Sequence, residues 1–173
     1  MKKTKNSIRS GSIIMGIIFL TLGCGAYRLG TTLPDNLQTV YVPTFKNTTY
    51  QPGITVDITN AVITRFRQDG NLQPVSRDEA DTTLSGEITG WERRVMGYTG
   101  EDENEVEEYR LYVTAVITFR SRSTGKLLTA RQKIRGYADF FTTGDLAEDE
   151  QAAEPDVYKD LARRIVDHVV SIW

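Results

Sequence analysis

Residues 109–119 carry a strict two-residue periodicity, which limits the fold more than any other part of this 173-residue chain. Successive side chains of a β-strand point to opposite faces, so apolar residues at every other position predict a long strand with one buried face. Such a strand requires a sheet around it and a second layer over its apolar side. The apolar positions are Tyr109, Leu111, Val113, Ala115, Ile117 and Phe119.

The segment after this strand predicts a partner strand and its register. The sequence SRSTGK is typical of a hairpin turn, with a two-residue loop at 124–125 that leads into a strand over 127–138. A shift of one residue would turn Thr129, Arg131 and Lys133 toward the apolar side, which is costly. We therefore predict the register in which three pairs face each other: Phe119 with Ala130, Ala115 with Ile134, and Val113 with Gly136.

Three further elements are predicted ahead of this hairpin. Residues 38–45 read as a first strand, in which Pro43 favours an edge position or a bulge. Apolar residues at helical spacing over 58–66 predict an amphipathic helix, and the glycine within residues 69–71 ends it. Residues 84–88 alternate as another strand.

The C-terminal part predicts a loop and a second helix, which complete the fold. Residues 142–155 read as an acidic loop that runs toward a helix start at Pro155. We expect an α/β fold in the order β-α-β-β-β-α: a two-layer sandwich with a four-stranded mixed sheet and two amphipathic helices on one face. One apolar stripe defines the last helix: Tyr158, Leu161, Ala162, Ile165, Val169 and Ile172.

The N-terminus has the layout of a secretory signal peptide. A basic start precedes a short apolar run over residues 13–22, and a small residue, Gly23, comes next. Ten helical residues extend only ~15 Å, half of the ~30 Å hydrocarbon core, so a permanent membrane span is not expected. We predict a lipoprotein signal peptide over residues 1–23, a lipidated tether over 24–36 and a single domain over 37–173.

The sequence LTLGC resembles a bacterial lipobox and accounts for the only cysteine of the chain. This resemblance implies cleavage before Cys24 and acylation of its thiol, with palmitate as a typical chain. Gly25 comes next, and no aspartate stands there to retain the protein in the inner membrane. The expected location is therefore the outer membrane, with the domain facing the periplasm. The alternative is an ordinary secreted protein with an unmodified thiol.

Composition limits the possible functions of the mature chain. Its 17 basic residues, counted without the four in the signal peptide, face 23 acidic ones, so the net charge is near −6. This balance argues against nucleic acid as a partner. One cysteine and one histidine do not make a Cys/His metal site, and enzyme motifs are absent. We expect neither a metal nor a cofactor, a packed or half-exposed His168, and a solvated acidic loop over residues 101–108, with cation binding as its alternative.

The predicted register gathers basic residues on the sheet face away from the helices. Arginine and lysine bind phosphates well, so this face is a candidate binding site for lipopolysaccharide or another anion. The alternative is a plain solvated face, partly neutralised by Glu87. The candidate residues are Arg110, Arg120, Arg131, Lys133 and Arg135, with Arg93 and Arg94 near one end.

The first third of the mature chain resembles the lipopolysaccharide-assembly lipoproteins of the LptE type. The resemblance covers residues 25–66, from GAYRLG through LPDNLQTVYVPTFKNTTYQPG to an amphipathic helix. The shared features are a Leu-Pro pair, a strand ending in Val-Pro-x-Phe-x-Asn, and a threonine-rich turn followed by Pro-Gly. The residues that carry it are Tyr27, Leu33, Pro34, Val42, Pro43, Phe45, Asn47, Pro52 and Gly53.

The resemblance implies binding and scaffolding work without covalent catalysis. The expected partners are an LptD-type outer-membrane β-barrel, which the chain would plug and help to assemble, and lipopolysaccharide on its way to the outer leaflet. One alternative is an outer-membrane lipoprotein that acts as adaptor or activator of another secretion or envelope-synthesis machine. Another is a carboxylate-dependent hydrolase, which would need two acidic side chains converging in a concave pocket.

Overall fold

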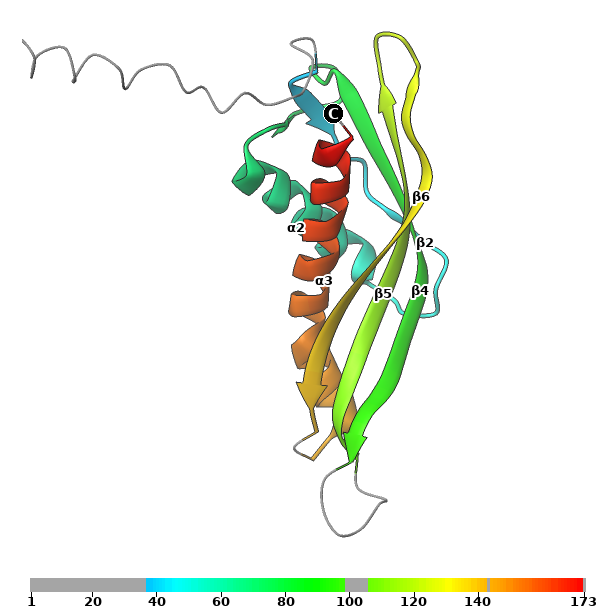
Figure 1. The fold of residues 1–173 in the computed structure, drawn as a ribbon, viewed down its shortest axis with the longest axis vertical. Helices are drawn as coiled ribbons and strands as arrows, with labels where there is room; N and C mark the ends of the chain where they lie inside the picture. The colour runs from blue at the N-terminus through cyan, green and yellow to red at the C-terminus, as the bar shows by residue number, and fades with distance from the viewer. Residues whose placement is uncertain (1–36, 99–105, 143, 173) are drawn as a thin grey trace, which may run out of the picture. The chain divides into compact units, whose positions relative to one another are not determined.

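The computed structural model describes residues 37–98, 106–142 and 144–172 (Figure 1). The predicted signal peptide, Cys24, the tether and most of the acidic loop therefore lie outside the described residues. Neither described helix is long and apolar enough to cross a membrane. Eight elements follow along the chain: β1 (Thr39–Tyr41), β2 (Lys46–Asn47), α2 (Ile54–Asp69), β3 (Gln73–Pro74), β4 (Thr82–Tyr98), β5 (Val106–Ser121), β6 (Leu127–Phe141) and α3 (Leu146–Ser171).

The strands form one mixed sheet. Its order is β3-β1-β4-β5-β6, and β2 lies beside β4. β1 pairs in parallel with β3 and β4, and β2 pairs in parallel with β4. β4, β5 and β6 are antiparallel neighbours. The predicted α/β class, the mixed sheet and the two helices are confirmed.

The predicted number of four strands was wrong, because the described residues contain six. Of the expected first strand, 38–45, only residues 39–41 form a strand (β1), and the separate short strand β2 begins after it, at Lys46. Pro43 has no N–H to donate to a ladder, and the N–H of Phe45 donates instead to the Thr59 hydroxyl of α2, at 3.0 Å. β3 is only two residues long, too short for any alternation to show. Two backbone hydrogen bonds hold it beside β1: the Gln73 N–H donates to the Gln38 carbonyl, and the Val75 N–H donates to the Val40 carbonyl.

The two helices cover the same side of the sheet in Figure 1, which we call the inner face. From position 111 to 119, every second residue of β5 points to this face and has no exposed area: Leu111, Val113, Ala115, Ile117 and Phe119. Opposite them lie Ile58, Val62 and Phe66 of α2, which are also fully buried. The glycine stop of α2 is confirmed, since Gly70 adopts a φ of 81° and its N–H donates to the Phe66 carbonyl. The predicted stripe of α3 joins the core through Leu161, Ile165 and Val169.

The predicted register holds in one half of the β5–β6 hairpin and fails in the other. Ala115 lies opposite Ile134 and Val113 opposite Gly136, as predicted. Phe119, however, lies opposite Thr129 and not Ala130, because the ladder shifts between Ile117 and Phe119. An extra residue in one strand of an antiparallel pair reverses the facing of the residues beyond it. Thr129 is therefore buried, and Ala130 is exposed.

The prediction of a loop over 142–155 was wrong from Leu146 onward, where α3 begins. The Asp145 carboxylate caps the helix by accepting hydrogen bonds from the N–H groups of Ala147 and Glu148. The first turn contains acidic residues, which interact favourably with the helix dipole. Acidic residues are also typical of a solvated loop, and the sequence alone does not separate the two. Pro155 lies inside α3 and not at its start. The buried Ala153 shows that this early part of the helix packs on the domain.

Gly136 fixes how closely α3 approaches β6. A Cβ atom at this position would lie 2.6 Å from the backbone nitrogen of Leu161, well inside van der Waals contact. The helix backbone therefore packs directly on the strand, and only glycine leaves room for it. This contact places α3 along β6, the edge strand of the sheet.

Candidate functional site

The candidate basic residues lie on strands β4, β5 and β6, whose side away from the helices we call the outer face. The ladders align its side chains in rows across the sheet. Tyr112 of β5 lies between Glu92 of β4 and Tyr137 of β6. In the next row, Arg110 lies between Arg94 and Asp139. The outer face therefore carries acidic and aromatic residues among its cations.

One row centres on the ring of Tyr112. The guanidinium groups of Arg94 and Arg135 lie 5.4 and 3.7 Å from the ring centroid, within cation–π range. Both also bind the Glu92 carboxylate, at 2.6 Å for Arg94 and 2.5 Å for Arg135. The hydrogen bond from Arg94 is the main cause that lowers the pKa of Glu92. Glu92 thus remains ionised and offsets one of the two positive charges.

The next row is neutralised in a similar way. The Arg110 guanidinium lies 4.4 Å from the centroid of the Tyr137 ring and binds the Asp139 carboxylate through two nitrogens, one of them at 2.7 Å. Its hydrogen bond to Asp139 raises the pKa of Arg110. The register predicted for β6 placed Asp139 on this face, two residues beyond Tyr137. Extending the alternation to that residue would have found this partner.

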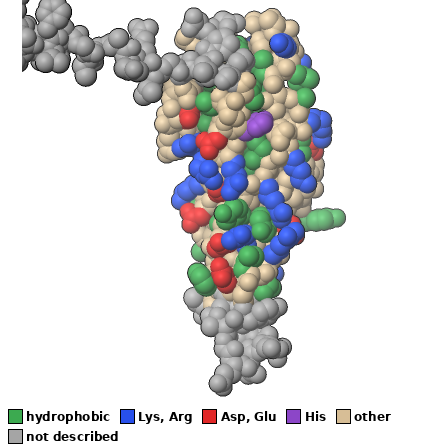
Figure 2. Space-filling view, viewed as in Figure 1, with side chains coloured by type: hydrophobic (Ala, Val, Ile, Leu, Met, Phe, Trp, Pro, Cys, Tyr) green, Lys and Arg blue, Asp and Glu red, His purple; other side chains and the backbone are tan. Residues whose placement is uncertain are grey.

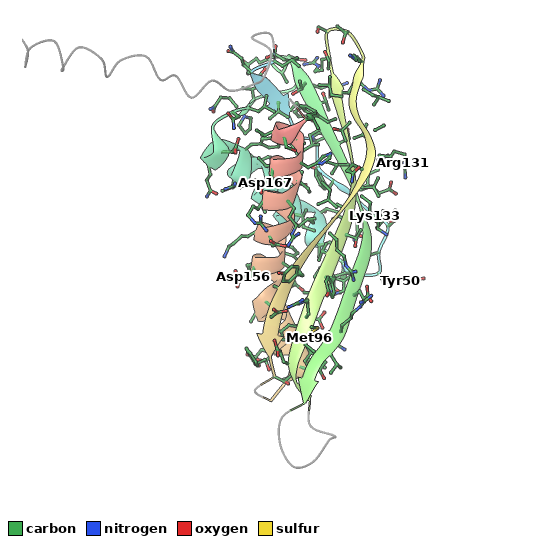
Figure 3. The ribbon with its side chains drawn as sticks, in the orientation of Figure 1. Tyr50, Met96, Arg131, Lys133, Asp156 and Asp167 are labelled. Atoms are coloured by element: carbon green, nitrogen blue, oxygen red, sulfur yellow. The ribbon has the colours of Figure 1, made fainter. Side chains whose placement is uncertain are left out.

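Three candidate cations of the outer face have no ion-pair partner among the described residues: Arg120, Arg131 and Lys133. Figure 3 labels Arg131 and Lys133 beyond β6, on the side away from α3. Arg131 lies where the ladder shifts and has a positive φ of 31°, which L-residues rarely adopt. Arg120 donates to the Gly125 carbonyl at 2.6 Å. The unpaired positive charge of the outer face is therefore concentrated toward the β5–β6 turn.

Arg93 does not belong to this face. It lies opposite Leu111, on the inner side, and forms an ion pair with Glu150 of α3. The Trp91 indole N–H donates to the same carboxylate at 3.0 Å. Residues two apart in a strand share a face, and Trp91 packs inward, so Arg93 also points inward. Our placement of Arg93 near the basic face was therefore wrong.

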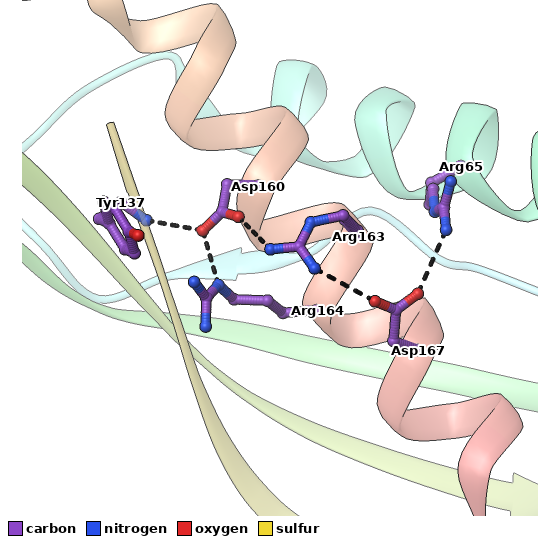
Figure 4. A network of polar contacts seen from close by, with 6 residues as sticks. All are labelled: Arg65, Tyr137, Asp160, Arg163, Arg164 and Asp167. Atoms are coloured by element: carbon purple, nitrogen blue, oxygen red, sulfur yellow. Dashed lines mark hydrogen bonds and ion pairs between the residues drawn. The ribbon is translucent and has the colours of Figure 1, made fainter. Parts of the chain in front are cut away.

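A polar network at the edge of β6 was not foreseen from the sequence (Figure 4). The backbone N–H of Tyr137 donates to the Asp160 carboxylate of α3 at 3.0 Å. Asp160 also accepts hydrogen bonds from Arg163 and Arg164 at 2.6 Å each. Burial would raise the pKa of Asp160, but these hydrogen bonds outweigh it and lower the pKa. Along α3 the network continues to α2 through Arg163, Asp167 and Arg65.

A groove of about 790 Å³ between α2 and α3 contains two carboxylates, Asp57 and Glu154. Glu154 accepts hydrogen bonds from the hydroxyl of Tyr158 at 2.7 Å and from Gln51 at 3.3 Å. Burial raises the pKa of Tyr158, so that hydroxyl keeps the proton it donates. Glu154 therefore links α3 to the loop that contains Gln51, and its hydrogen bonds serve the structure of the domain.

Two further expectations from the sequence concern His168 and metal binding. His168 is half-buried in the last turn of α3, as predicted. The described residues contain no cluster of three metal-ligating side chains. Basic and acidic side chains are interleaved over the face seen in Figure 2.

Comparison with known proteins identifies the family. A family model described as LptE, lipopolysaccharide assembly, matches residues 37–169, from the start of the described domain to the last turns of α3. The chain belongs to the LptE family. The resemblance predicted from the first third of the mature chain is thereby confirmed. The matched residues also include strands β4, β5 and β6. The LptE family is defined by lipopolysaccharide assembly and not by a catalysed reaction.

Several solved structures are similar to this LptE-family chain. A minor lipoprotein from Acinetobacter baumannii is 14% identical, with a TM-score of 0.51 over 78% of this chain and 93% of that one. A protein from Xanthomonas campestris is 13% identical, with a TM-score of 0.57 over 78% and 84%. A hypothetical protein from Chlamydia trachomatis is 10% identical, with a TM-score of 0.56 over 79% and 97%. These identities show a shared fold alone. No curated protein matches the chain.

Proposed function

We propose that this LptE-family chain is an outer-membrane lipoprotein that plugs and helps to assemble an LptD-type β-barrel. It assists lipopolysaccharide on its passage to the outer leaflet. The observation that carries the proposal is the match of a lipopolysaccharide-assembly family over residues 37–169. The partners are the barrel and the glycolipid, and the work is binding and scaffolding.

The proposed anchor is the acylated thiol of Cys24. Each CH₂ group buried in the bilayer contributes ~0.8 kcal/mol, and a lipoprotein carries several acyl chains, so attachment is stable. The tether over residues 24–36 then links the membrane to a domain that faces the periplasm. Cys24→Ser should release the protein from the membrane fraction, and unchanged fractionation would contradict lipidation.

The proposed glycolipid-binding surface is the part of the outer face around Arg131 and Lys133. The phosphates of lipid A need cations that are not already engaged. Arg94, Arg110 and Arg135 are held by carboxylates of the same face. Arg131 and Lys133 are exposed and free of ion pairs within the described residues. Bound phosphate would meet them without first breaking an ion pair.

A charge-matched pair of variants tests this surface. Arg131→Gln with Lys133→Gln should weaken lipopolysaccharide binding about tenfold at fixed salt, the effect of ~1.4 kcal/mol from lost charge-assisted hydrogen bonds. The control, Arg67→Gln with Lys159→Gln, removes the same charge from exposed positions on α2 and α3. Equal dissociation constants for the two double variants would remove the surface from the proposal.

A cellular experiment tests the function as a whole. Depletion of the chain should lower the amount of folded barrel in the outer membrane and should reduce lipopolysaccharide at the cell surface. Both quantities should recover when the wild-type chain is expressed again. Normal surface lipopolysaccharide and normal barrel levels after depletion would contradict the proposed function.

A further inference from the structure

Tyr50 is the most exposed large hydrophobic residue of the described chain. Its side chain has a relative exposure of 107%, which means that no neighbouring group covers it. Figure 3 labels Tyr50 beyond β4, on the side of the sheet away from α3. In the same orientation, Figure 2 shows a hydrophobic side chain protruding from the outline of the molecule at that height. Packing within the domain therefore gives no reason for an aromatic residue here.

The loop that carries Tyr50 is held in place on both sides. Before it, the N–H and hydroxyl of Thr48 donate to the Ile88 carbonyl of β4, at 3.0 and 2.9 Å. After it, the Gln51 side chain donates to Glu154 of α3 at 3.3 Å. Tyr50 is thus presented between two fixed points, one on the sheet and one on a helix.

Asn47 closes the loop from within. Its amide nitrogen donates to the Gln51 carbonyl at 2.6 Å, and its amide oxygen accepts from the N–H and hydroxyl of Thr49 at 2.9 and 2.7 Å. Gly53 then adopts a φ of 80°, a conformation that L-residues rarely take, and turns the chain into α2. A side chain on a preorganised loop loses little conformational entropy when it binds.

The segment around Tyr50 carries no charge. The ten residues between Lys46 and Asp57 include no charged side chain, in a chain that is 25% charged overall. Val56, in the first turn of α2, adds apolar surface with 57% exposure. The centres of protein interfaces are depleted in charge and enriched in tyrosine. A few buried aromatic anchors supply most of the binding energy of such interfaces.

We propose that Tyr50 is an anchor residue that inserts into an uncharged, concave pocket on the wall of a protein partner. The inference rests on the proposed function, in which that partner is the barrel. Tyr50 lies on the same side of the sheet as Arg131 and Lys133 in Figure 3, so a wall that approaches the outer face meets it. Because none of its own side chains is charged, the loop matches an uncharged protein surface better than an anionic headgroup.

Competition in cells tests this anchor. A tagged Tyr50→Ala chain and a differently tagged wild-type chain are expressed equally while the barrel is limiting. We expect at least tenfold fewer barrels with the variant, as for the loss of ~1.4 kcal/mol. Tyr50→Phe, which keeps the ring, should stay within threefold of wild type. The matched control is Leu127→Ala, at another exposed hydrophobic residue (45%).

The outcomes separate the anchor from the proposed function. Tyr50→Ala should melt like wild type, because the side chain supports nothing inside the domain. Equal occupancy of the barrel by Tyr50→Ala and wild type would overturn the anchor and leave the proposed function standing. Recovery of no barrel with the wild-type chain would overturn both. A photocrosslinking residue at position 50 should join the barrel protein, and adducts with lipid alone would also overturn the anchor.

Discussion

The two faces of β5 differ sharply although they belong to one strand. On the inner face, Leu111, Val113 and Ile117 are fully buried and meet the helices. On the outer face, Arg110 and Tyr112 join rows of arginine, tyrosine and carboxylate. The inner face determines the fold, and the outer face, which does not contribute to the core, is the proposed binding surface. The number of basic residues on the outer face is also larger than the positive charge that a ligand would meet, because neighbouring carboxylates neutralise several of these cations.

The largest difference between the faces should come from placing the same charge on each. Ile117→Asp puts a carboxylate in the core without a partner, which costs several kcal/mol, comparable with the ~5–15 kcal/mol stability of a typical domain. Thr118→Asp puts it on the outer face and should cost about 1 kcal/mol or less. Urea unfolding measures both variants. Similar midpoints would refute our assignment of the two faces.

The next effect concerns how closely a helix packs on the inner face. Gly136→Ala would place a Cβ atom 2.6 Å from the Leu161 backbone nitrogen, and we expect a loss of about 1–3 kcal/mol. In Gly97→Ala, the nearest atom is a Glu108 carboxylate oxygen at 3.6 Å, so this control should be near neutral. If the two variants have equal free energies of unfolding, α3 does not touch β6 as described.

A smaller and pH-dependent effect is expected at the edge of β6. Asp160→Asn keeps one acceptor for the Tyr137 N–H but loses the charge that binds two arginines, at a cost of about 1 kcal/mol. The folded pKa of Asp160 is lowered, so its contribution is present above the ordinary value of about 3.9 and is lost as pH falls through the folded pKa. The gap between wild type and variant should therefore be open at neutral pH and close in acid. A gap independent of pH would argue against the network.

The smallest stability effect is expected for the ion pairs of the outer face. Exposed ion pairs contribute little, so Glu92→Gln should change the free energy of unfolding by about 0.5 kcal/mol or less. It should nevertheless strengthen lipopolysaccharide binding about threefold, because Arg94 and Arg135 lose a competing anion. The control Glu148→Gln removes the same charge from the start of α3 and should not change binding. Equal affinities for both variants would show that the row of Arg94 and Arg135 does not contribute to glycolipid binding.

The sequence predicted those elements whose pattern reflects a local rule. The alternation of β5 is strict enough to assign its faces, and the stripe of α3 and the glycine stop of α2 follow helical spacing. The shift near Arg131 was not predictable, because a bulge is a compromise between two strands and leaves no regular pattern. The beginning of α3 was missed because acidic residues suit both a helix start and a solvated loop.

The candidate site was predicted in part, for a similar reason. The facing of Arg110, Arg131, Lys133 and Arg135 followed from alternation, but alternation does not reveal which groups neutralise them. Glu92 meets Arg135 only across β5, which requires a register that includes an irregularity between Ile88 and Gly90. The link between Asp160 and Tyr137 depends on how a helix lies against an edge strand, which no local pattern encodes.

Purification of the acylated protein from outer membranes in mild detergent tests most directly whether this LptE-family chain works within a barrel. We expect a large outer-membrane β-barrel protein to remain bound in equimolar amount and to be identified by mass spectrometry. Recovery of the chain alone, or with a periplasmic enzyme in place of the barrel, would contradict the proposed function.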